Sequence, residues 1–170
     1  LIFSSGYLAN IALTSALLQG RDDVVYEDRL NHASIVDSAN LSRSKLKRYS
    51  HADTESLCKL MGKQKAGKKL VYTDAVFSMD GDIAPLKEIA KHSANQQALL
   101  VVDDAHGFGV LGDSGKGALE LCKLDQDEVP LLIVTFGKAL GASGACIAGS
   151  DEITEVLIQR ARPFIYSTAL

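Results

Sequence analysis

The sequence predicts an α/β protein built on a mostly parallel sheet, and two observations support this prediction. Short apolar runs of strand length, rich in Val, Ile and Leu, alternate along the chain with segments of helical period. These runs lack the regular alternation of apolar and polar residues that marks a strand with one solvated face. The repeated order of strand, helix and strand therefore indicates parallel strands that are covered by helices on both faces.

Four apolar runs are predicted as buried strands. Each is three to five residues long, and each is followed by polar or glycine-rich residues. The predicted strands are residues 24–26, 70–72, 99–102 and 131–135.

Four other segments have helical period and suitable terminal residues. The predicted helices are residues 8–18, 54–61, 85–93 and 150–162. Asp53 can cap the second of them, and Pro85 suits the first turn of the third. The fourth begins with acidic residues and ends with Arg160 and Arg162, and both features complement the helix dipole.

Composition excludes several classes of protein. The chain has 170 residues, 46% apolar and 23% charged, which is ordinary for one globular domain or slightly more. The net charge of −3 argues against a nucleic-acid binder, whose surface would be strongly basic. The apolar runs are far too short to span a bilayer, and the chain opens without the pattern of a secretory signal.

The cysteines and the chain ends carry two further expectations. The three cysteines include no CxxC pair and are odd in number, which is typical of a reducing compartment and predicts a cytoplasmic protein. Leu1 and Leu170 both lie in or beside apolar stretches. We therefore expect residues 1–170 to be the interior of a longer polypeptide.

Residues 107–112 match the pattern GxGxxG after a predicted strand, so an NAD-dependent Rossmann enzyme is one alternative. The motif requires glycines that join the strand directly to a helix, with the pyrophosphate at the helix N-terminus. Here the polar residues 103–106 intervene, and the loop-like segment 113–117 follows. The spacing therefore disfavours a dinucleotide site.

Three weaker patterns also fail. Residues 62–69 read GxxxxGKK but lack the Ser or Thr that binds magnesium, and they precede a strand, so a solvated loop is expected there. Residues 112–115 read GDSG, as in serine-protease nucleophile loops, but the α/β pattern does not suit that barrel. The four histidines and three cysteines show no zinc-ligand spacing, so no metal is expected.

In parallel sheets ligands bind at the carboxyl ends of the strands, so the residues after each apolar run are candidate site residues. Asp103 comes directly after a predicted buried strand, and His106 lies three residues later. A buried carboxylate is costly unless it meets a cation or hydrogen-bond donors. Lys138 follows another strand, between Gly137 and Gly141, which allow a large ligand to approach the backbone.

Each of these features also has an ordinary structural explanation. An Asp at a strand end is often a helix cap or an ion-pair partner, a lysine in a glycine loop is usually solvated, and Ser-Ser-Gly at residues 4–6 is often a plain N-cap. Together, however, they match pyridoxal 5'-phosphate (PLP), which requires a Schiff-base lysine, an acid at the pyridinium nitrogen and a phosphate cup. We expect Asp103 to be ionised. Burial and nearby positive charge are expected to lower the pKa of Lys138.

Six stretches carry a more specific resemblance. They read SSGYLAN, HAS, VFSMDGDIAPL, VDDAHGFGVLG, TFGKALGASGA and YSTAL, at residues 4–10, 32–34, 76–86, 102–112, 135–145 and 166–170. In these motifs the chain resembles the α-oxoamine synthase family of fold-type I PLP-dependent enzymes. The resemblance implies the seven-stranded, mostly parallel sheet of the PLP-dependent transferase large domain. Residues 1–170 would be the central part of that domain, without its N-terminal segment and the C-terminal small domain.

The resemblance implies roles around the cofactor ring. Lys138 would be the Schiff-base lysine and the acid/base at the substrate α-carbon, and Asp103 would pair with the pyridine nitrogen. His106 and Ser78 would contact the phenolic oxygen. His32 would stack on the ring, whereas the residues alone indicate only a helix start with an incidental histidine.

The resemblance also implies a phosphate site and supporting residues. The amides of Gly6 and Tyr7 and the hydroxyl of Thr135 would hold the phosphate, and Ser167 or Thr168 would add a contact from the partner subunit of a homodimer. Two more acids match family positions and are expected in supporting roles. These are Asp80, in a turn, and Asp104, behind the site.

The implied reaction is the decarboxylative condensation of L-alanine with a pimeloyl thioester, on coenzyme A or acyl carrier protein, in biotin synthesis. A sibling activity such as glycine C-acetyltransferase, 5-aminolevulinate synthase or serine palmitoyltransferase is the alternative. A noncatalytic domain of the same fold is an alternative of another class. The Ala84-Pro85 pair, residues 104–107 and residues 135–137 favour the biotin enzyme among the siblings.

Overall fold

The computed structural model describes residues 1–62 and 67–168, which form one sheet of seven strands. The strands are β1 (Ile2–Phe3), β2 (Val24–Asp28), β3 (Lys45–Tyr49), β4 (Lys69–Asp74), β5 (Leu99–Asp103), β6 (Leu131–Thr135) and β7 (Ala145–Ala148). Their order in the sheet is β1-β7-β6-β5-β4-β2-β3, and the five strands from β6 to β3 are parallel. Strand β7 runs antiparallel to both of its neighbours, β1 and β6, and the predicted mostly parallel, seven-stranded sheet is confirmed.

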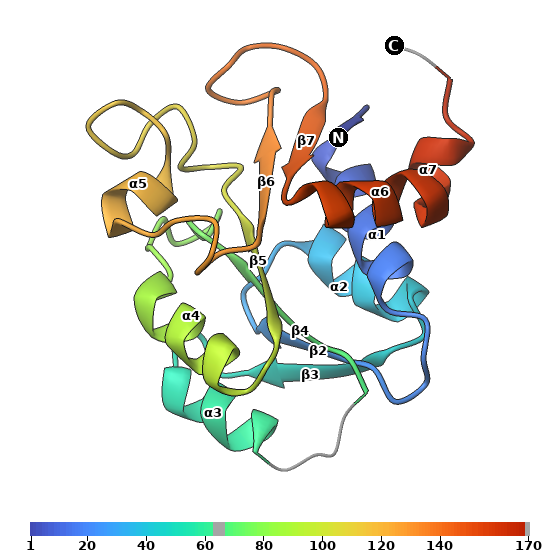
Figure 1. Cartoon of the computed structure of the whole chain (residues 1–170). Coiled ribbons are helices and arrows are strands. Elements are labelled where there is room, and N and C mark those ends of the chain that lie inside the picture. Colours follow the sequence, from blue (N-terminus) through green and yellow to red (C-terminus); the bar gives the residue numbers. More distant parts are fainter. Residues whose placement is uncertain (63–66, 169–170) are drawn as a thin grey trace.

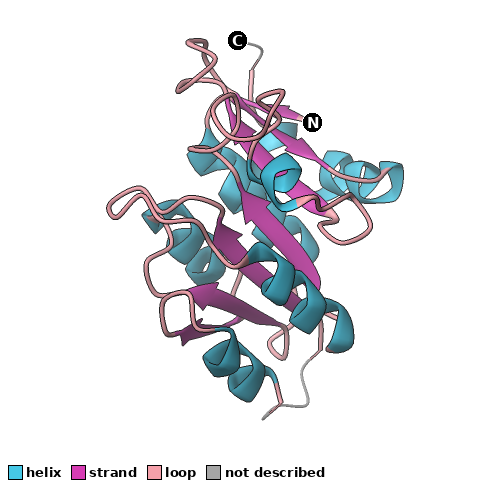
Figure 2. Cartoon of the chain, turned by 90° about the vertical axis from the view of Figure 1, so that its left-hand side faces the viewer, coloured by secondary structure: helices cyan, strands magenta, loops and turns pink. Residues whose placement is uncertain are grey.

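Helices cover both faces of the sheet (Figures 1 and 2). They are α1 (Gly6–Leu17), α2 (Ala33–Leu41), α3 (Thr54–Met61), α4 (Leu86–Asn95), α5 (Ala118–Cys122), α6 (Asp151–Arg160) and α7 (Arg162–Ile165). Helices α1, α2 and α6 pack on one face, and α3 and α4 pack on the other. None of the helices that the structure describes has the length and apolar character needed to cross a bilayer.

Burial on both faces explains why the strands read as continuous apolar runs. In β2 the side chain of Val25 packs in the core under α1 and α2, whereas Val24 and Tyr26 pack in the core under α3 and α4. All five residues of this strand are buried. The same division recurs in β5, where Val101 faces the first core and Val102 the second.

All four predicted strands and all four predicted helices are present, with ends that differ by a few residues. The predicted helix 150–162 is interrupted at Ala161, whose backbone is extended before Pro163. Pro85 caps α4 from outside the helix and is not part of its first turn. Lys69 begins β4 and is not in the predicted loop 62–69, of which residues 63–66 lie outside the described residues.

Sequence patterns missed β1, β3, β7 and α5, and they indicated only the start of α2. The first and third of these strands are very short, and β3 is an edge strand with the charged sequence KLKRY. The glycine motif at residues 107–112 forms turns, and the next helix after the motif begins only at Ala118. The motif therefore lacks the geometry of a dinucleotide site, as the spacing indicated.

A histidine between two carboxylates joins the loops at one edge of the sheet. The Nδ1 atom of His51 lies 3.0 Å from Asp28, at the end of β2, and its Nε2 atom lies 2.8 Å from Asp82, in the loop after β4. The ring also packs edge-on against Phe77, with centroids 4.5 Å apart. Burial lowers the pKa of His51, but the two carboxylates outweigh this effect and raise the pKa above its usual value.

The His51 contacts predict a stability contribution that depends on pH. Because the folded-state pKa is raised, the contribution is complete below the unfolded-state pKa of about 6.5 and disappears as the pH rises through the folded-state value. We expect His51→Gln to lower the unfolding free energy of the full-length protein by roughly 1 kcal/mol at pH 6, and by less at pH 9. Urea unfolding at the two pH values measures this, with His92→Gln as the control. An equal loss at both values would contradict the prediction.

Candidate active site

The carboxyl ends of five strands meet at one edge of the sheet and surround a cavity of about 340 Å³. This volume lies in the range of small-molecule sites. The segments after β1, β2, β4, β5 and β6 all contribute to its wall. Every cofactor-site residue predicted within one subunit lines it, namely Gly6, Tyr7, His32, Ser78, Asp103, His106, Thr135 and Lys138.

Asp103 forms the floor of the cavity at the end of β5 and is only 5% exposed. The backbone N–H of Ala105 donates to its Oδ1 at 3.1 Å, and the side-chain amide of Asn10 donates to its Oδ2 at 3.0 Å. Burial raises the pKa of Asp103, whereas these donors and the charge of Lys138 lower it and offset part of the rise. The carboxylate is therefore placed to accept a strong hydrogen bond from a cationic ligand.

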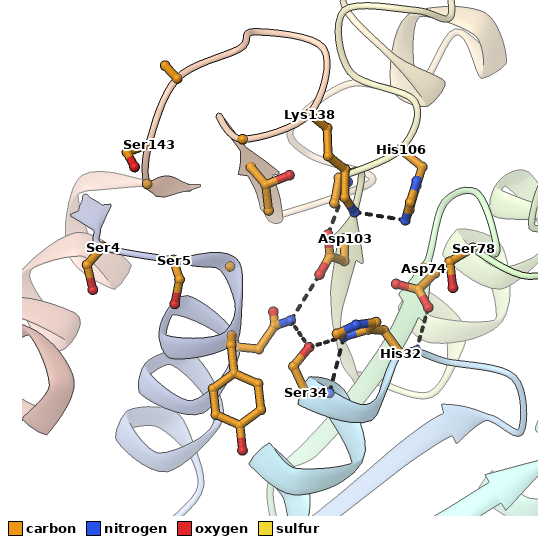
Figure 3. A pocket seen from close by; sticks show the side chains of 18 residues that line it. Ser4, Ser5, His32, Ser34, Asp74, Ser78, Asp103, His106, Lys138 and Ser143 are labelled. Carbon is orange, nitrogen blue, oxygen red and sulfur yellow. Dashed lines mark hydrogen bonds between the residues drawn. The ribbon is translucent and has the colours of Figure 1, made fainter.

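Lys138 enters the same cavity from the loop after β6, and its Nζ lies 2.8 Å from Nε2 of His106 (Figure 3). Burial lowers the pKa of Lys138, as expected, but the predicted contribution of nearby positive charge is wrong. Its charged neighbours include Asp103 and Asp74, which raise the pKa and partly oppose burial. Burial and the lysine charge both lower the pKa of His106, so a neutral imidazole can accept the hydrogen bond of the lysine.

His32 caps the N-terminus of α2, which agrees with the helix start indicated by the residues alone. Its backbone N–H donates to Asp74 Oδ2 at 2.7 Å, and its Nδ1 lies 2.7 Å from Ser34 Oγ. The exposed imidazole lies at the cavity wall (Figure 3). These contacts hold the backbone of His32 and the Nδ1 side of its ring.

Asp74 is a cavity residue that the sequence analysis missed. It ends β4 and pairs in register with Asp103 on β5. Burial and the charge of Asp103 raise the pKa of Asp74 to about 8. The strand-end position that singled out Asp103 could have found it, but the predicted strand ended two residues earlier, at Tyr72.

The N-terminus of α1 faces the end of β6. Ser5 caps the helix by accepting a hydrogen bond from Leu8 N–H, and the amides of Gly6 and Tyr7 have no acceptor within the helix. A Cβ atom at Gly6 would lie 2.5 Å from Thr135 Cγ2, so a side chain does not fit there. The Thr135 hydroxyl is buried without a partner in the described residues. Amides, a helix dipole and an unpaired hydroxyl together suit an anion.

The other predicted residues differ in their surroundings. Ser78 is exposed at the cavity wall, and the Tyr7 hydroxyl turns to α2, where it donates to Asp37 at 2.9 Å. Ser167 and Thr168 do not line this cavity and border a separate groove.

The two supporting acids also differ. Asp104 is fully buried and accepts the backbone N–H of Ala118 at 2.8 Å, which holds the loop behind the cavity. Asp80 lies in an exposed turn.

Comparison with known proteins identifies the family. The sequence matches the family described as aminotransferase class I and II over residues 1–170. The chain belongs to this family. Curated relatives of this aminotransferase-family chain include 8-amino-7-oxononanoate synthases from Methylococcus capsulatus, 53% identical, and Marinobacter nauticus, 54% identical. The alignments cover 100% of the chain but 44% and 43% of those proteins, so the chain spans less than half of their length.

Solved structures agree with the family assignment. A serine palmitoyltransferase from S. paucimobilis, with a bound PLP–myriocin aldimine, superimposes with a TM-score of 0.94 at 33% identity. The 8-amino-7-oxononanoate synthase from Francisella tularensis superimposes with a TM-score of 0.85 at 39% identity. Both matches cover 100% of the chain, and 42% and 48% of the respective structures. The family resemblance and the fold expected from the six motifs are confirmed.

The charges around Lys138 predict a response to Asp74→Asn. Removing this carboxylate should lower the pKa of Lys138 further, because Asp74 raises it. The effect should grow as the pH rises through about 8, where Asp74 ionises. Acetylation of Lys138 by acetic anhydride, followed by mass spectrometry of the full-length apoprotein, should be severalfold faster in the variant above pH 8. Asp113→Asn, on an exposed loop, is the control, and slower labelling in Asp74→Asn would contradict the prediction.

Proposed function

We propose that the chain is the central part of the large domain of a PLP-dependent 8-amino-7-oxononanoate synthase. Such an enzyme condenses L-alanine with a pimeloyl thioester, on coenzyme A or acyl carrier protein, and releases carbon dioxide. One observation carries the proposal. A buried carboxylate at Asp103 and an amine of lowered pKa at Lys138 face one cavity whose wall also contains an anion cradle.

The residues present fit PLP at both ends of that molecule. The unpaired Thr135 hydroxyl and the free amides of Gly6 and Tyr7 offer donors for a phosphate, and the absence of a side chain at Gly6 leaves the approach open. At the floor of the cavity, Asp103 offers a buried carboxylate that would pair with a pyridinium nitrogen.

Each residue would have a defined task in binding. Asp103 would hold the ring nitrogen protonated, Ser78 and His106 would contact the phenolic oxygen, and the His32 ring would cover one face of the cofactor. When bound, PLP would act as the electron sink that stabilises negative charge at the substrate α-carbon. Asp103 makes this possible because its carboxylate stabilises the cationic ring.

Lys138 and His106 would handle protons. Lowering the pKa of Lys138 increases the share of neutral amine, and the neutral amine would attack a carbonyl and accept a proton from the substrate α-carbon. The contact of 2.8 Å between Lys138 Nζ and His106 Nε2 holds the amine in the cavity. The lowered pKa of His106 keeps a neutral acceptor beside it.

The relatives support the choice of substrates and leave a sibling reaction as the second candidate. The 8-amino-7-oxononanoate synthases are 53% and 54% identical to the chain, and the serine palmitoyltransferase is 33% identical. We propose a cytoplasmic homodimer in which Ser167 or Thr168 reaches the phosphate of the partner subunit. The three cysteines are all free in the described residues, which suits a reducing compartment.

The cofactor assignment predicts a visible property. The purified full-length protein should be yellow, and Lys138→Ala should lose both the absorption band of the lysine-bound cofactor and all turnover. Lys91→Ala, on the exposed surface of α4, should keep both. A colourless wild-type protein that takes up no PLP would support the noncatalytic alternative.

The phosphate cradle predicts that Gly6→Ala weakens cofactor binding. The new Cβ would lie 2.5 Å from Thr135 Cγ2, so the start of α1 or the threonine must shift. Either shift would misalign the backbone amides and the hydroxyl that would donate to the phosphate. We expect the affinity of the apoprotein for PLP to fall about tenfold, which corresponds to the loss of one hydrogen bond to a charged group. Gly62→Ala is the control, because its Cβ would meet Cys58 O at an ordinary 3.5 Å. Unchanged affinity in Gly6→Ala would exclude this cradle.

A substrate panel tests the reaction. The full-length enzyme should be most active with L-alanine and pimeloyl thioesters, among alanine, glycine and serine combined with pimeloyl, acetyl, succinyl and palmitoyl thioesters. Preference for glycine with acetyl-CoA would instead identify glycine C-acetyltransferase, and preference for serine with palmitoyl-CoA a serine palmitoyltransferase.

A further inference from the structure

A buried chain of polar side chains connects two walls of the cavity. The side-chain amide of Asn10, on α1, donates to Asp103 Oδ2 at 3.0 Å and to Ser34 Oγ at 2.7 Å. Ser34 Oγ in turn lies 2.7 Å from His32 Nδ1. Asn10 and Ser34 are each 1% exposed. The dashed lines in Figure 3 follow this path from Asp103 through Ser34 to His32.

The chemistry of the partners fixes the direction of every hydrogen bond. An ionised carboxylate only accepts, so the side of the Asn10 amide that faces Asp103 must be its NH₂ group. The second N–H of that group then points to Ser34, whose oxygen accepts it. The remaining Asn10 oxygen accepts the hydroxyl of Tyr72, which is fully buried. Both N–H groups and the oxygen of the Asn10 amide therefore each have a hydrogen-bond partner.

These directions determine which nitrogen of His32 carries the proton. Because the Ser34 oxygen accepts from Asn10, its own proton is available for His32 Nδ1. The backbone N–H of Ser34, which can only donate, also points to Nδ1, at 3.2 Å. Two donors aimed at one ring nitrogen require that this nitrogen be an acceptor. The proton of the neutral ring then lies on Nε2.

We propose that Asn10 and Ser34 are positioning residues that act as one unit, keeping Asp103 an acceptor and His32 a neutral ring with its proton on Nε2. This inference deepens the proposed function and rests on it for the cofactor, because Asp103 and His32 would contact the ring of PLP. Asn10 also lines the cavity, but in this role it acts through Asp103 and His32, whose state it sets.

A purely structural role for Asn10 can be separated from this one. One turn further along the same two helices, Thr14 Oγ1 and Ser38 Oγ form another buried hydrogen bond, at 2.9 Å. Both pairs join α1 to α2, but Thr14 and Ser38 do not line the cavity. Ser38→Ala therefore removes a comparable contact between the helices and leaves the chain to Asp103 and His32 intact.

The first experiment needs no cofactor. Nitrogen-15 NMR of the full-length apoprotein with labelled histidine distinguishes the two ring nitrogens, and His32→Gln assigns the signals. We expect His32 to be protonated on Nε2 in the wild type and in Ser38→Ala, and to shift towards a mixture of tautomers in Asn10→Ala and Ser34→Ala. Protonation of Nδ1 in the wild type, or signals unchanged in both variants, would overturn the proposal.

The second experiment measures PLP affinity of the apoprotein by titration. Asn10→Ala leaves one oxygen of Asp103 without its side-chain donor, so binding should weaken about ten- to hundredfold. Ser34→Ala retains that donor and should change the affinity less than about threefold, and Ser38→Ala should not change it. Equal weakening of PLP binding in Asn10→Ala and Ser38→Ala would show that Asn10 acts only through helix packing and would contradict the proposal.

Measurements of stability and of PLP binding distinguish failure of this inference from unfolding of a variant and from failure of the proposed function. Thermal melting of each variant identifies unfolding, and if Asn10→Ala does not fold, the His32 spectrum of Ser34→Ala decides the matter. A wild-type protein that binds no PLP would overturn the proposed function, whereas the tautomer of His32 would still test the hydrogen-bond chain.

Discussion

The site depends on the parallel direction of neighbouring strands, which brings their carboxyl ends to one edge of the sheet. Asp74 and Asp103 lie in register at that edge, and Thr135 ends the next strand. Lys138 and Ser78 follow in the adjoining loops. Residues more than one hundred positions apart in the sequence thus share one cavity.

This placement has an electrostatic consequence. Two carboxylates, Asp74 and Asp103, share one buried region; burial raises the pKa of both, and the charge of Asp103 raises the pKa of Asp74 further. Lys138 is the cation that lowers both pKa values, and its own pKa is lowered by burial. The cavity therefore favours a ligand that brings positive charge to its floor. A protonated heterocycle supplies that charge and also leaves the lysine free to be neutral, so cofactor binding and lysine reactivity would support each other.

The sequence predicted what depends on local patterns and missed what depends on tertiary contacts. Apolar runs covered on both faces identified β5 and β6, and the residues after them led to Asp103 and Lys138. The edge strand β3 was missed because its charged residues look like a loop until β2 provides hydrogen-bond partners. Asp74 was missed because the predicted strand ended at Tyr72, and the pairing with β5 that extends β4 to Asp74 is a tertiary contact. The wrong cause assigned to the Lys138 pKa has the same origin, since its charged neighbours come from other strands.

Helix α1 connects the two ends of the cavity. Its first residue, Gly6, faces Thr135 at the anion cradle, and Asn10, four residues later, donates to Asp103. Four residues of α-helix rise about 6 Å and make slightly more than one turn, so both contacts lie on the same side of the helix. A rotation or shift of α1 would move the phosphate donors and the amide that supports Asp103 together. The spacing between Gly6 and Asn10 therefore couples the anion cradle to the carboxylate at the cavity floor, because one helix sets the positions of the donors at both places.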